Sequence, residues 1–568
     1  MIPATNVPSP PPCACVSYVN CKVPLRDGLK MAADVYLPPD CLGKKIPCML
    51  TYSPYAATVN RQTAMIYNYL PKGVAVVAAD CRGLHHSEGT FHPWQKGFVE
   101  DAYDLLDWIS SQTWSNGKIA MVGGSYPGAT QLACLRSGHP ALTVCAPSAV
   151  TLDPYSIYYR NGVQIIAFQG SWHIGISTHA PAPKDAMTFG DSAKQFPVGE
   201  IADRMGVDCQ SWKEQCAHDG RDAFWQEKAD LHDLAKSKAG IFYQGSWFDK
   251  LGVQTFETFK KFQETVTDET KDSPRKYSCL RVGPWGHGVN TPEGEIDYGK
   301  DAMVTEDAEI DFLTSVLNDR APATATNPAP MQIFVMGKNI WRFEKEWPLD
   351  RTVYTPLYLL SDGAANTAAG DGRLSFEAPA GCAEADRFAF NPTDPVPSNG
   401  GRDVGHGGQR DQSEIEKRDD VLVYTGDVLE KDLEVTGRVS AVLHVASTAP
   451  DTDFTVKLVD IFPDGRPMSV LDGIVRARFR DGVDKPPRLM KPGEHVRLEF
   501  FVDVTSYCFL KGHRIRVEVS SSNFPHFAPN PNTGRPVSTE TEWKNATQTI
   551  FHTAEEPSHV ILPVIPED

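Results

Sequence analysis

The sequence predicts an α/β fold, in which a doubly wound parallel sheet carries an inserted helical cap and precedes a C-terminal all-β domain. Three observations lead to this prediction. In the first third of the chain, short apolar runs alternate with amphipathic stretches of helical spacing. The next segment is rich in Trp, His, Ala and Asp and has no strong strand pattern. Beyond about residue 330, short apolar runs are separated by Asp-Gly and Pro-Gly turns.

The first part of the sheet domain is expected over residues 17–150. Its apolar runs have the length of buried strands, and the stretches between them place apolar residues on one helical face. Parallel strands need such crossovers to connect them. The expected strands are 47–52, 74–79 and 118–123, and the expected helices are 97–110 and 128–136.

The α/β pattern is then interrupted and returns. Residues 151–235 are expected to form the helical cap, and residues 236–320 the second part of the sheet domain. A stretch rich in Pro, Ala and Thr, residues 321–330, predicts a linker. The elements expected in the second part are strands at 239–245 and 278–283 and a helix at 308–318.

Residues 330–565 predict a jelly-roll β-sandwich. Several short strands joined by long connections are typical of that architecture. The clearest strand runs are 421–424, 439–445, 454–461, 496–504 and 515–520.

Composition excludes several classes of protein. A net charge of −17 argues against a general nucleic-acid or anionic-membrane binder, and no apolar run approaches the roughly 18 residues of a membrane span. The 13 cysteines are scattered without CxxC pairs, so they predict neither a zinc site nor a disulfide framework. We therefore expect free thiols, a reducing cytoplasmic location, and no cofactor or metal. A homodimer is left open.

One turn has the pattern of a catalytic nucleophile. The strand at 118–122 runs into Gly123-Gly124-Ser125-Tyr126-Pro127-Gly128, and a helix follows. A sharp strand–turn–helix connection exposes the serine hydroxyl, and small neighbours let the strand and helix approach each other. The pattern departs from strict G-x-S-x-G because Pro127 holds the place of the second glycine. The alternative is a phosphate-binding or plain turn, although no P-loop pattern is present.

A nucleophilic serine needs a base and an acid that orients the base. In α/β-hydrolases these follow the serine in the order acid, then histidine, on loops after later strands. Asp249 comes just after the strand at 240–245, where it is equally suited to cap the next helix. His287 lies between glycines after the strand at 279–282, and chain order favours the base over a solvated loop residue.

The negative charge of an acyl-transfer transition state needs hydrogen-bond donors. The backbone N–H of Tyr126, the residue after the serine, is one candidate. The hydroxyl of Tyr55, which follows the strand at 47–52, is the other. Spacing alone favours a surface tyrosine packed on Pro54.

Together these motifs resemble the CocE/NonD family of serine hydrolases, which groups cocaine esterases, α-amino-acid ester hydrolases, glutaryl-cephalosporin acylases and X-Pro dipeptidyl peptidases. The resemblance covers nearly the whole chain from about residue 17. Its matching segments are Arg26-Asp27-Gly28, the loop from Asp80-Cys81-Arg82-Gly83 to Gly89, the block from Trp114 to Gln131, Gly245 to Asp249, Gly283 to His287, Asp451 to Phe454, Asp460 to Arg466, Gly512 to Arg516, and Ser521 to Pro525.

The resemblance implies a role for each candidate. Ser125 would be the nucleophile, His287 the base and Asp249 the orienting acid, and an oxyanion hole would combine the Tyr55 hydroxyl with the Tyr126 N–H. One departure is His85, which stands where the family usually has glycine. We expect His85 to have a structural role in its loop.

These residues predict a serine hydrolase that cleaves an ester or amide bond of a small molecule through an acyl-Ser125 intermediate. Candidate substrate-binding residues are Trp172, Trp247 and Leu251. An acyltransferase or a C–C bond hydrolase acting on a specialised metabolite would use the same triad. A non-catalytic ligand-binding protein on a hydrolase scaffold is an alternative of another class, against which the intact candidate triad counts.

Overall fold

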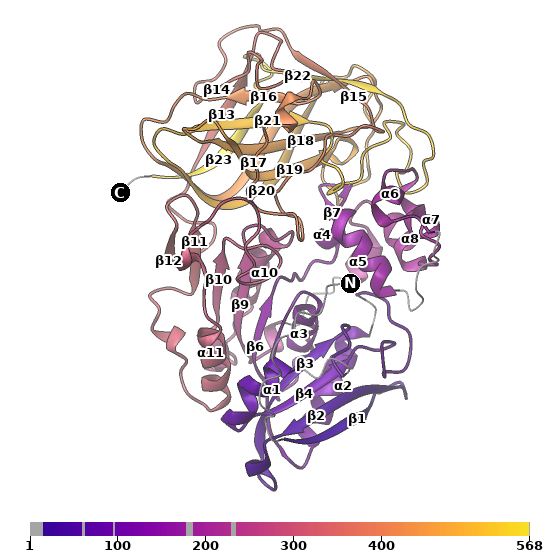
Figure 1. The fold of residues 1–568 in the computed structure, drawn as a ribbon, viewed down its shortest axis with the longest axis vertical. Coiled ribbons are helices and arrows are strands. Elements are labelled where there is room, and N and C mark those ends of the chain that lie inside the picture. The colour runs from indigo at the N-terminus through magenta and orange to yellow at the C-terminus, as the bar shows by residue number, and fades with distance from the viewer. Residues whose placement is uncertain (1–14, 59–62, 95–96, 178–185, 229–233, 567–568) are drawn as a thin grey trace.

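The computed structural model describes residues 15–58, 63–94, 97–177, 186–228 and 234–566. Figure 1 shows two sheets along the long axis of the molecule. The sheet of the N-terminal domain lies in the lower half, the sheet of the C-terminal domain lies above it, and short helices lie beside the boundary between them.

The N-terminal sheet is mixed. Its ten strands have the order β1-β2-β4-β3-β5-β6-β9-β10-β11-β12, and the run from β4 to β11 is parallel. Both edges are antiparallel, which the prediction of a parallel sheet did not include, because tight hairpins join β1 to β2 and β11 to β12. The strands are β1 (Val16–Pro24), β2 (Lys30–Leu37), β3 (Ile46–Ser53), β4 (Ala75–Asp80), β5 (Ser115–Gly124), β6 (Leu142–Ser148), β9 (Gly240–Ser246), β10 (Cys279–Gly283), β11 (Met331–Val335) and β12 (Ile340–Glu344).

Helices cover both faces of this sheet. Apolar residues of α2, α3 and α10 pack in one core cluster, and those of α1 and α11 pack in another. Alternate strand residues supply the two faces: Leu50 of β3 belongs to the first cluster and Met49 to the second. The helices are α1 (Thr63–Tyr69), α2 (Phe98–Ser111), α3 (Tyr126–Ser137), α10 (Gly252–Glu264) and α11 (Asp307–Leu317), and 3-10 turns are η1 (Pro39–Cys41), η2 (Leu70–Lys72), η5 (Pro274–Tyr277) and η6 (Lys300–Ala302).

The segment between β6 and β9 is mainly helical and also contains one short hairpin. Asn161, at the turn of that hairpin, donates from Nδ2 to the carbonyl oxygens of Ile474 (2.8 Å) and Phe501 (2.9 Å) in the C-terminal domain. The segment is therefore fastened to both domains. Its elements are α4 (Tyr155–Tyr158), β7 (Tyr159–Arg160), β8 (Val163–Gln164), α5 (Ala167–Ser177), α6 (Phe189–Ala193), η3 (Val198–Glu200), α7 (Ile201–Arg204), α8 (Gln210–Cys216), α9 (Ala223–Lys228) and η4 (Leu234–Lys236).

The C-terminal domain contains an eleven-stranded, mostly antiparallel sheet, and each of the five predicted strand runs falls on one of its strands. The boundary expected at residue 330 differs, because β11 and β12 follow it and still belong to the first sheet. The turns in the linker and domain are η7 (Ala323–Thr326), η8 (Ile415–Lys417) and η9 (Ala477–Phe479). The strands are β13 (Val353–Leu360), β14 (Arg373–Ser375), β15 (Asp386–Phe390), β16 (Leu422–Thr425), β17 (Leu433–Ser447), β18 (Asp453–Ile461), β19 (Pro467–Arg476), β20 (Val496–Phe509), β21 (Arg514–Ser520), β22 (Ala546–Phe551) and β23 (His559–Ile565).

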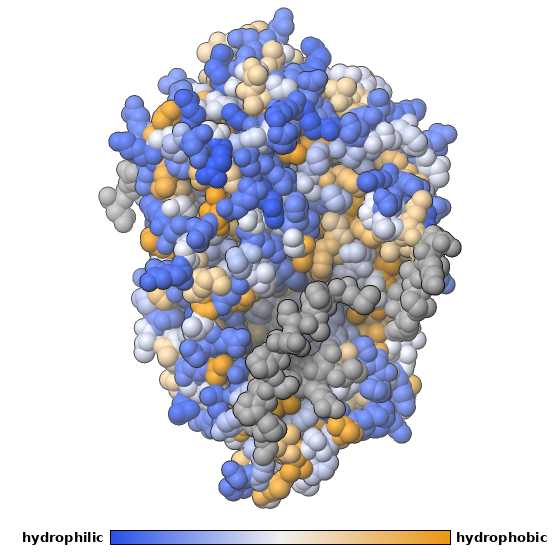
Figure 2. All heavy atoms as spheres, viewed as in Figure 1, coloured by the Kyte–Doolittle hydropathy of each residue, from blue (hydrophilic) through white to orange (hydrophobic). Residues whose placement is uncertain are grey.

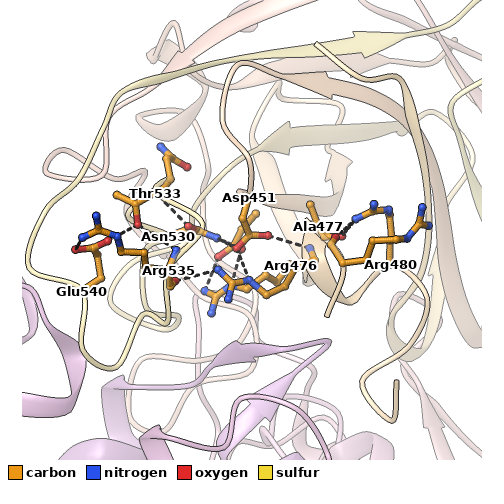
Figure 3. Close-up of polar contacts among 12 residues, drawn as sticks. Asp451, Arg476, Ala477, Arg480, Asn530, Thr533, Arg535 and Glu540 are labelled. Carbon is orange, nitrogen blue, oxygen red and sulfur yellow. Dashed lines mark hydrogen bonds and ion pairs between the residues drawn. The ribbon is translucent and has the colours of Figure 1, made fainter. Parts of the chain in front are cut away.

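A buried ionic network ties strands of this domain to its long C-terminal loop (Figure 3). Arg476 makes two hydrogen bonds of 2.9 Å to the carboxylate of Asp453, and both side chains are 1% exposed. Asn530 donates to Asp451 and to Asp453 at 2.9 Å. Because the Arg476 N–H also donates to the carbonyl of Asn161 at 3.2 Å, the network reaches the turn of the helical segment.

Hydrophilic residues cover most of the C-terminal domain on the face that Figure 2 shows, with smaller apolar areas between them. None of the helices in the described ranges combines the length and the apolarity that crossing a membrane requires.

Candidate active site

Ser125 occupies a strained turn between β5 and α3. Its φ and ψ are 62° and −128°, a region that residues with a side chain rarely adopt, at a cost of order 1–3 kcal/mol. The Ser125 N–H donates to the carbonyl of Ser148 (3.0 Å), and the Ser125 carbonyl accepts from the N–H groups of Gly128 (2.9 Å) and Ala129 (3.1 Å). These bonds fix the turn in the conformation that presents the hydroxyl.

Two glycines permit the close approach of α3 to β6. A Cβ atom at Gly124 would lie 2.6 Å from Ser148 Oγ, and one at Gly128 would lie 2.9 Å from the Ser148 carbonyl oxygen. In the usual G-x-S-x-G pattern the second glycine stands two residues after the serine, a position that Pro127 holds here. The close contact with Ser148 and Val150 instead falls at Gly128, one residue later.

The three residues of the candidate triad meet at one point, although they come from three loops. His287 Nε2 lies 3.0 Å from Ser125 Oγ, and His287 Nδ1 lies 3.1 Å from Asp249 Oδ1. In the neutral ring with its proton on Nδ1, His287 donates to Asp249 and accepts from Ser125. A serine hydroxyl so placed has a base within reach of its proton.

Asp249 is buried, with 1% of its surface exposed. Burial by itself raises the pKa of this carboxyl, but the charge and hydrogen bond of His287 and the N–H of Leu251 outweigh it and leave the pKa below the ordinary value. Asp249 is therefore ionised at neutral pH. Its Oδ1 accepts from the Leu251 N–H at 3.1 Å, whereas α10 begins at Gly252 without a side-chain cap. The alternative prediction, a helix-capping role, does not describe this geometry.

The hydroxyl of Tyr55 lies among the groups of the site. It accepts a hydrogen bond from Trp172 Nε1 at 2.9 Å. Burial raises the pKa of this phenol, while hydrogen bonds with the Ser125 side chain, Trp172 and the Tyr126 backbone oppose that rise. The Tyr55 hydroxyl therefore lies close to the Ser125 side chain and to the Tyr126 backbone. The ring, 36% exposed, reaches the site from the surface.

His85 braces the loop that carries Tyr55. Its Nε2 accepts a hydrogen bond from the N–H of Ala56 at 2.8 Å and lies 3.0 Å from the carbonyl oxygen of Pro54, so the ring contacts both neighbours of Tyr55. The φ of His85 is +52°, a conformation that glycine adopts without strain. His85 is not among the residues that line the cavity beside Ser125.

A small cavity of about 30 Å³ adjoins Ser125 and His287. Of the three residues predicted to bind substrate, Trp172 and Leu251 line it. Trp247 does not: it is 2% exposed, stacks on Phe256 at 5.5 Å and donates from Nε1 to the carbonyl of Phe334 at 2.8 Å. Its side chain points into the core between α10 and β11, so the prediction for Trp247 is corrected to a packing role.

Sequence reasoning missed seven residues of the cavity wall: Trp94, Ala149, Val150, Ile157, Phe168, Gln169 and Lys250. Phe168 and Trp172 are four residues apart, a spacing that puts them on one face of α5 and could have suggested both. Lys250 directly follows the predicted acid. Trp94 lies in a loop, where no periodicity could have identified it.

Comparisons with protein families cover both domains. The sequence model of the X-Pro dipeptidyl-peptidase (S15 family) matches residues 27–289, and that of the X-Pro dipeptidyl-peptidase C-terminal non-catalytic domain matches residues 323–561. The first match lies on the N-terminal sheet domain with the helical segment, and the second covers the C-terminal domain together with the β11–β12 hairpin of the first sheet.

Similar proteins extend over the full chain. Cocaine esterase of Rhodococcus sp. (strain MB1 Bresler) is 36% identical over 581 residues, which cover 96% of this chain and 98% of that protein. Among solved structures, an α-amino acid ester hydrolase aligns with a TM-score of 0.80 at 24% identity, over 99% of this chain and 100% of that chain. An aminopeptidase from the marine sediment archaeon Thaumarchaeota archaeon aligns with a TM-score of 0.82 at 24% identity, over 99% of each chain. These two likenesses show a shared fold.

Proposed function

The chain belongs to the CocE/NonD family of serine hydrolases, and from that membership we propose how it cleaves the ester bonds of small molecules: through an acyl-Ser125 intermediate. The observation that carries the proposal is the position of His287, whose two ring nitrogens lie 3.0 Å from Ser125 Oγ and 3.1 Å from Asp249 Oδ1. That is the arrangement a hydroxyl needs to become nucleophilic.

In the first half of the reaction, Ser125 Oγ attacks the carbonyl carbon while His287 Nε2 takes the hydroxyl proton. The charge that forms on the carbonyl oxygen is stabilised by the Tyr55 hydroxyl and the Tyr126 N–H, and the imidazolium is stabilised by Asp249. The bond to the leaving oxygen breaks, and His287 returns the proton to the departing alcohol. The acyl group remains on Ser125.

In the second half, a water molecule takes the place of the alcohol. His287 accepts its proton as the oxygen attacks the acyl carbon, and the same donors stabilise the charge. The acid is released when His287 returns the proton to Ser125. Trp172 and Leu251 are proposed to contact the acyl group.

Active-site labelling tests this assignment. A fluorophosphonate probe, which reacts with activated serines, is expected to label the wild-type protein once, at Ser125, and to leave Ser125→Ala unlabelled. Ser125→Ala is also expected to lose hydrolysis of p-nitrophenyl and aryl esters. A Ser125→Ala protein that is labelled and active as the wild type would refute the proposal.

Other acyl chemistry would use the same residues. Cleavage of amide bonds, including those of X-Pro anilides, is recognised by the amine that it releases. An acyltransferase is recognised by the new ester or amide that it forms when alcohols or amines are added. A C–C bond hydrolase would release a ketone or arene instead of an alcohol. A non-catalytic binding protein would give no label at all.

The finer architecture is part of the proposal. We propose that the C-terminal domain is a jelly roll, which its antiparallel strands support. We also propose the divisions 17–150 and 236–320 for the two parts of the hydrolase core, 151–235 for the cap and 330–565 for the jelly-roll domain. The last range includes the β11–β12 hairpin, although that hairpin pairs with the first sheet. A reducing, cytoplasmic location is supported by the cysteines within the described ranges, which are free thiols.

A further inference from the structure

One wall of the otherwise apolar cavity beside Ser125 is polar. Lys250 and Gln169 line it, and they are 5% and 2% exposed. Lys250 Nζ donates to Gln169 Oε1 and lies 4.6 Å from the centre of the Phe168 ring. The mechanism of ester cleavage uses neither side chain.

This wall has more hydrogen-bond donors than acceptors. Gln169 Nε2 and Trp94 Nε1 are buried and have no acceptor in hydrogen-bond geometry among the described residues. The Tyr158 hydroxyl, which lies 2.9 Å from His173 Nδ1, is near enough for both N–H groups to oppose the rise that burial causes in its pKa, but it is outside hydrogen-bond geometry for either. Among the described residues that line the wall, Gln169 has the one side-chain amide oxygen, Oε1, and it already accepts from Lys250. Buried donors are normally satisfied, so the wall is complementary to an acceptor that the protein does not supply.

The same wall carries a positive charge with no counter-ion of its own. Lys250 forms no ion pair within the described part of the chain: Asp249 is bound to His287, and Asp403 lies 3.8 Å from His526. Burial lowers the pKa of Lys250 to about 8, and the charges of Asp249 and Asp403 limit that shift, so the ammonium form predominates at neutral pH.

We propose that this wall binds a carboxylate on the acyl group of the substrate, which makes the preferred substrates half-esters of short dicarboxylic acids. The inference rests on the proposed function of Ser125. Lys250 supplies the positive charge, and Gln169 Nε2 and Trp94 Nε1 supply oriented hydrogen-bond donors. Hydrolysis of such a half-ester releases the dicarboxylic acid and the alcohol.

Two physical arguments favour a short, anionic acyl group. The cavity, at about 30 Å³, has no room for a long chain. The ammonium of Lys250 has already been removed from water by folding, so a carboxylate that reaches it meets a preorganised partner and needs only its own dehydration. A neutral acyl group of the same size would leave the donors unsatisfied, which is a strong basis for discrimination.

The test compares three benzyl esters whose acyl groups differ by at most one heavy atom: the half-ester of succinic acid, the 4-oxopentanoate and the pentanoate. The wild-type protein is expected to cleave the half-ester with a kcat/KM about tenfold or more above that of the pentanoate. Affinity for the same esters is measured by calorimetry on Ser125→Ala, where the same order is expected without turnover.

Variants assign the effect to the wall. Lys250→Met and Gln169→Leu are expected to reduce the ratio of kcat/KM for half-ester over pentanoate by about tenfold. Lys260→Met is the matched control: it removes a lysine whose side chain is 47% exposed on α10 and should leave this ratio as in the wild type.

The outcomes separate this inference from the proposed function. If the wild-type protein cleaves the pentanoate or the 4-oxopentanoate better than the half-ester, and Ser125→Ala abolishes the reaction, the carboxylate site is refuted while the triad stands. If the esters are not cleaved, the proposed function fails, and the calorimetric order on Ser125→Ala still decides the carboxylate site. Equal binding of the three esters there would overturn it.

Discussion

At the scale of single residues, the site depends on a carboxylate that stays charged where water does not reach. The pKa of Asp249 remains low because His287 and the Leu251 N–H outweigh burial. The buried anion can therefore hold His287 in the tautomer whose Nε2 accepts the serine proton.

Replacing that carboxylate tests its role. Asp249→Asn keeps the shape and removes the charge, so kcat for aryl esters is expected to fall about a thousandfold or more, while the far-UV circular dichroism stays unchanged. Steady-state kinetics measure the loss, and fluorophosphonate labelling of Ser125 should slow in parallel. A loss of less than tenfold would contradict the orienting role.

His85 gives a second residue-scale prediction. Because its Nε2 spans Pro54 and Ala56, His85→Ala should loosen the Tyr55 hydroxyl and lower kcat by about tenfold, with little change in KM. Tyr55→Phe removes the donor outright and should lower kcat by about 10²–10³.

A double-mutant cycle distinguishes positioning from a general structural effect. The His85→Ala change should cost almost nothing more once Tyr55→Phe is present, since both act on one hydroxyl. His495→Ala, at an exposed site in the C-terminal domain, serves as the control and should leave kcat unaltered. Independent, multiplicative losses at 85 and 55 would argue against the bracing role.

At the scale of elements, α11 packs on the sheet through its apolar residues and adds a hydrogen bond from an acidic side chain. Gln244 Nε2 of β9 donates to Glu309 Oε2 at 2.6 Å, and burial, followed by the charge of Glu306, raises the pKa of Glu309 to about 7. An unfolded chain releases this proton near pH 4.3. Between roughly pH 4.3 and 7 the folded protein therefore binds more protons, and the contribution of Glu309 to stability falls as the pH rises.

Glu309→Gln should remove that dependence. The variant is expected to melt at a higher temperature than the wild type at pH 8 and at nearly the same temperature at pH 4, because the charge at this partly buried site is absent from the wild type only at the lower pH. Differential scanning calorimetry at the two pH values measures the difference. An Asn68→Ala control, which removes a hydrogen bond to the exposed neighbour Glu306, should show no such pH-dependent gain. A gain of equal size at both pH values would show that ionisation is not its cause.

Local patterns predicted many elements, but not the partners of the edge strands. Runs such as 74–79 are apolar enough to identify β4 and to place it inside the sheet. The β11–β12 hairpin has the same character as the strands after it, and only long-range pairing with β10 assigns it to the first sheet. Similarly, Trp247 and Leu251 are both apolar residues near Asp249, and sequence could not show that one side chain points into the core and the other into the cavity.

At the scale of the whole molecule, the two domains share a continuous interior, while most buried apolar residues of the helical segment form clusters of their own. One cluster of buried apolar residues includes Leu50 of the first sheet, Trp347 in the connection and Leu443 of the second sheet. The ionic network around Arg476 adds a polar tie to the same interface, through the backbone bond to Asn161.

Breaking that network should destabilise the molecule. Arg476→Met leaves Asp453 buried and unpaired, at an expected cost of about 3–5 kcal/mol, which thermal and urea denaturation would register as a lower midpoint. The double variant Arg476→Met with Asp453→Leu removes both charges and should recover most of the loss. A single variant as stable as the wild type would show that the ion pair is dispensable.

The β11–β12 hairpin after the linker determines where the chain can be truncated to express the catalytic half alone. A fragment that stops at residue 330 would expose the unpaired backbone of β10 along one side of a parallel sheet, and such edges promote aggregation. Even a stop after β12 would omit Trp347, whose ring stacks on Phe256 with 3.9 Å between centres. An expression fragment of the catalytic half should therefore extend through Leu349 and stop short of Val353, where the next sheet starts.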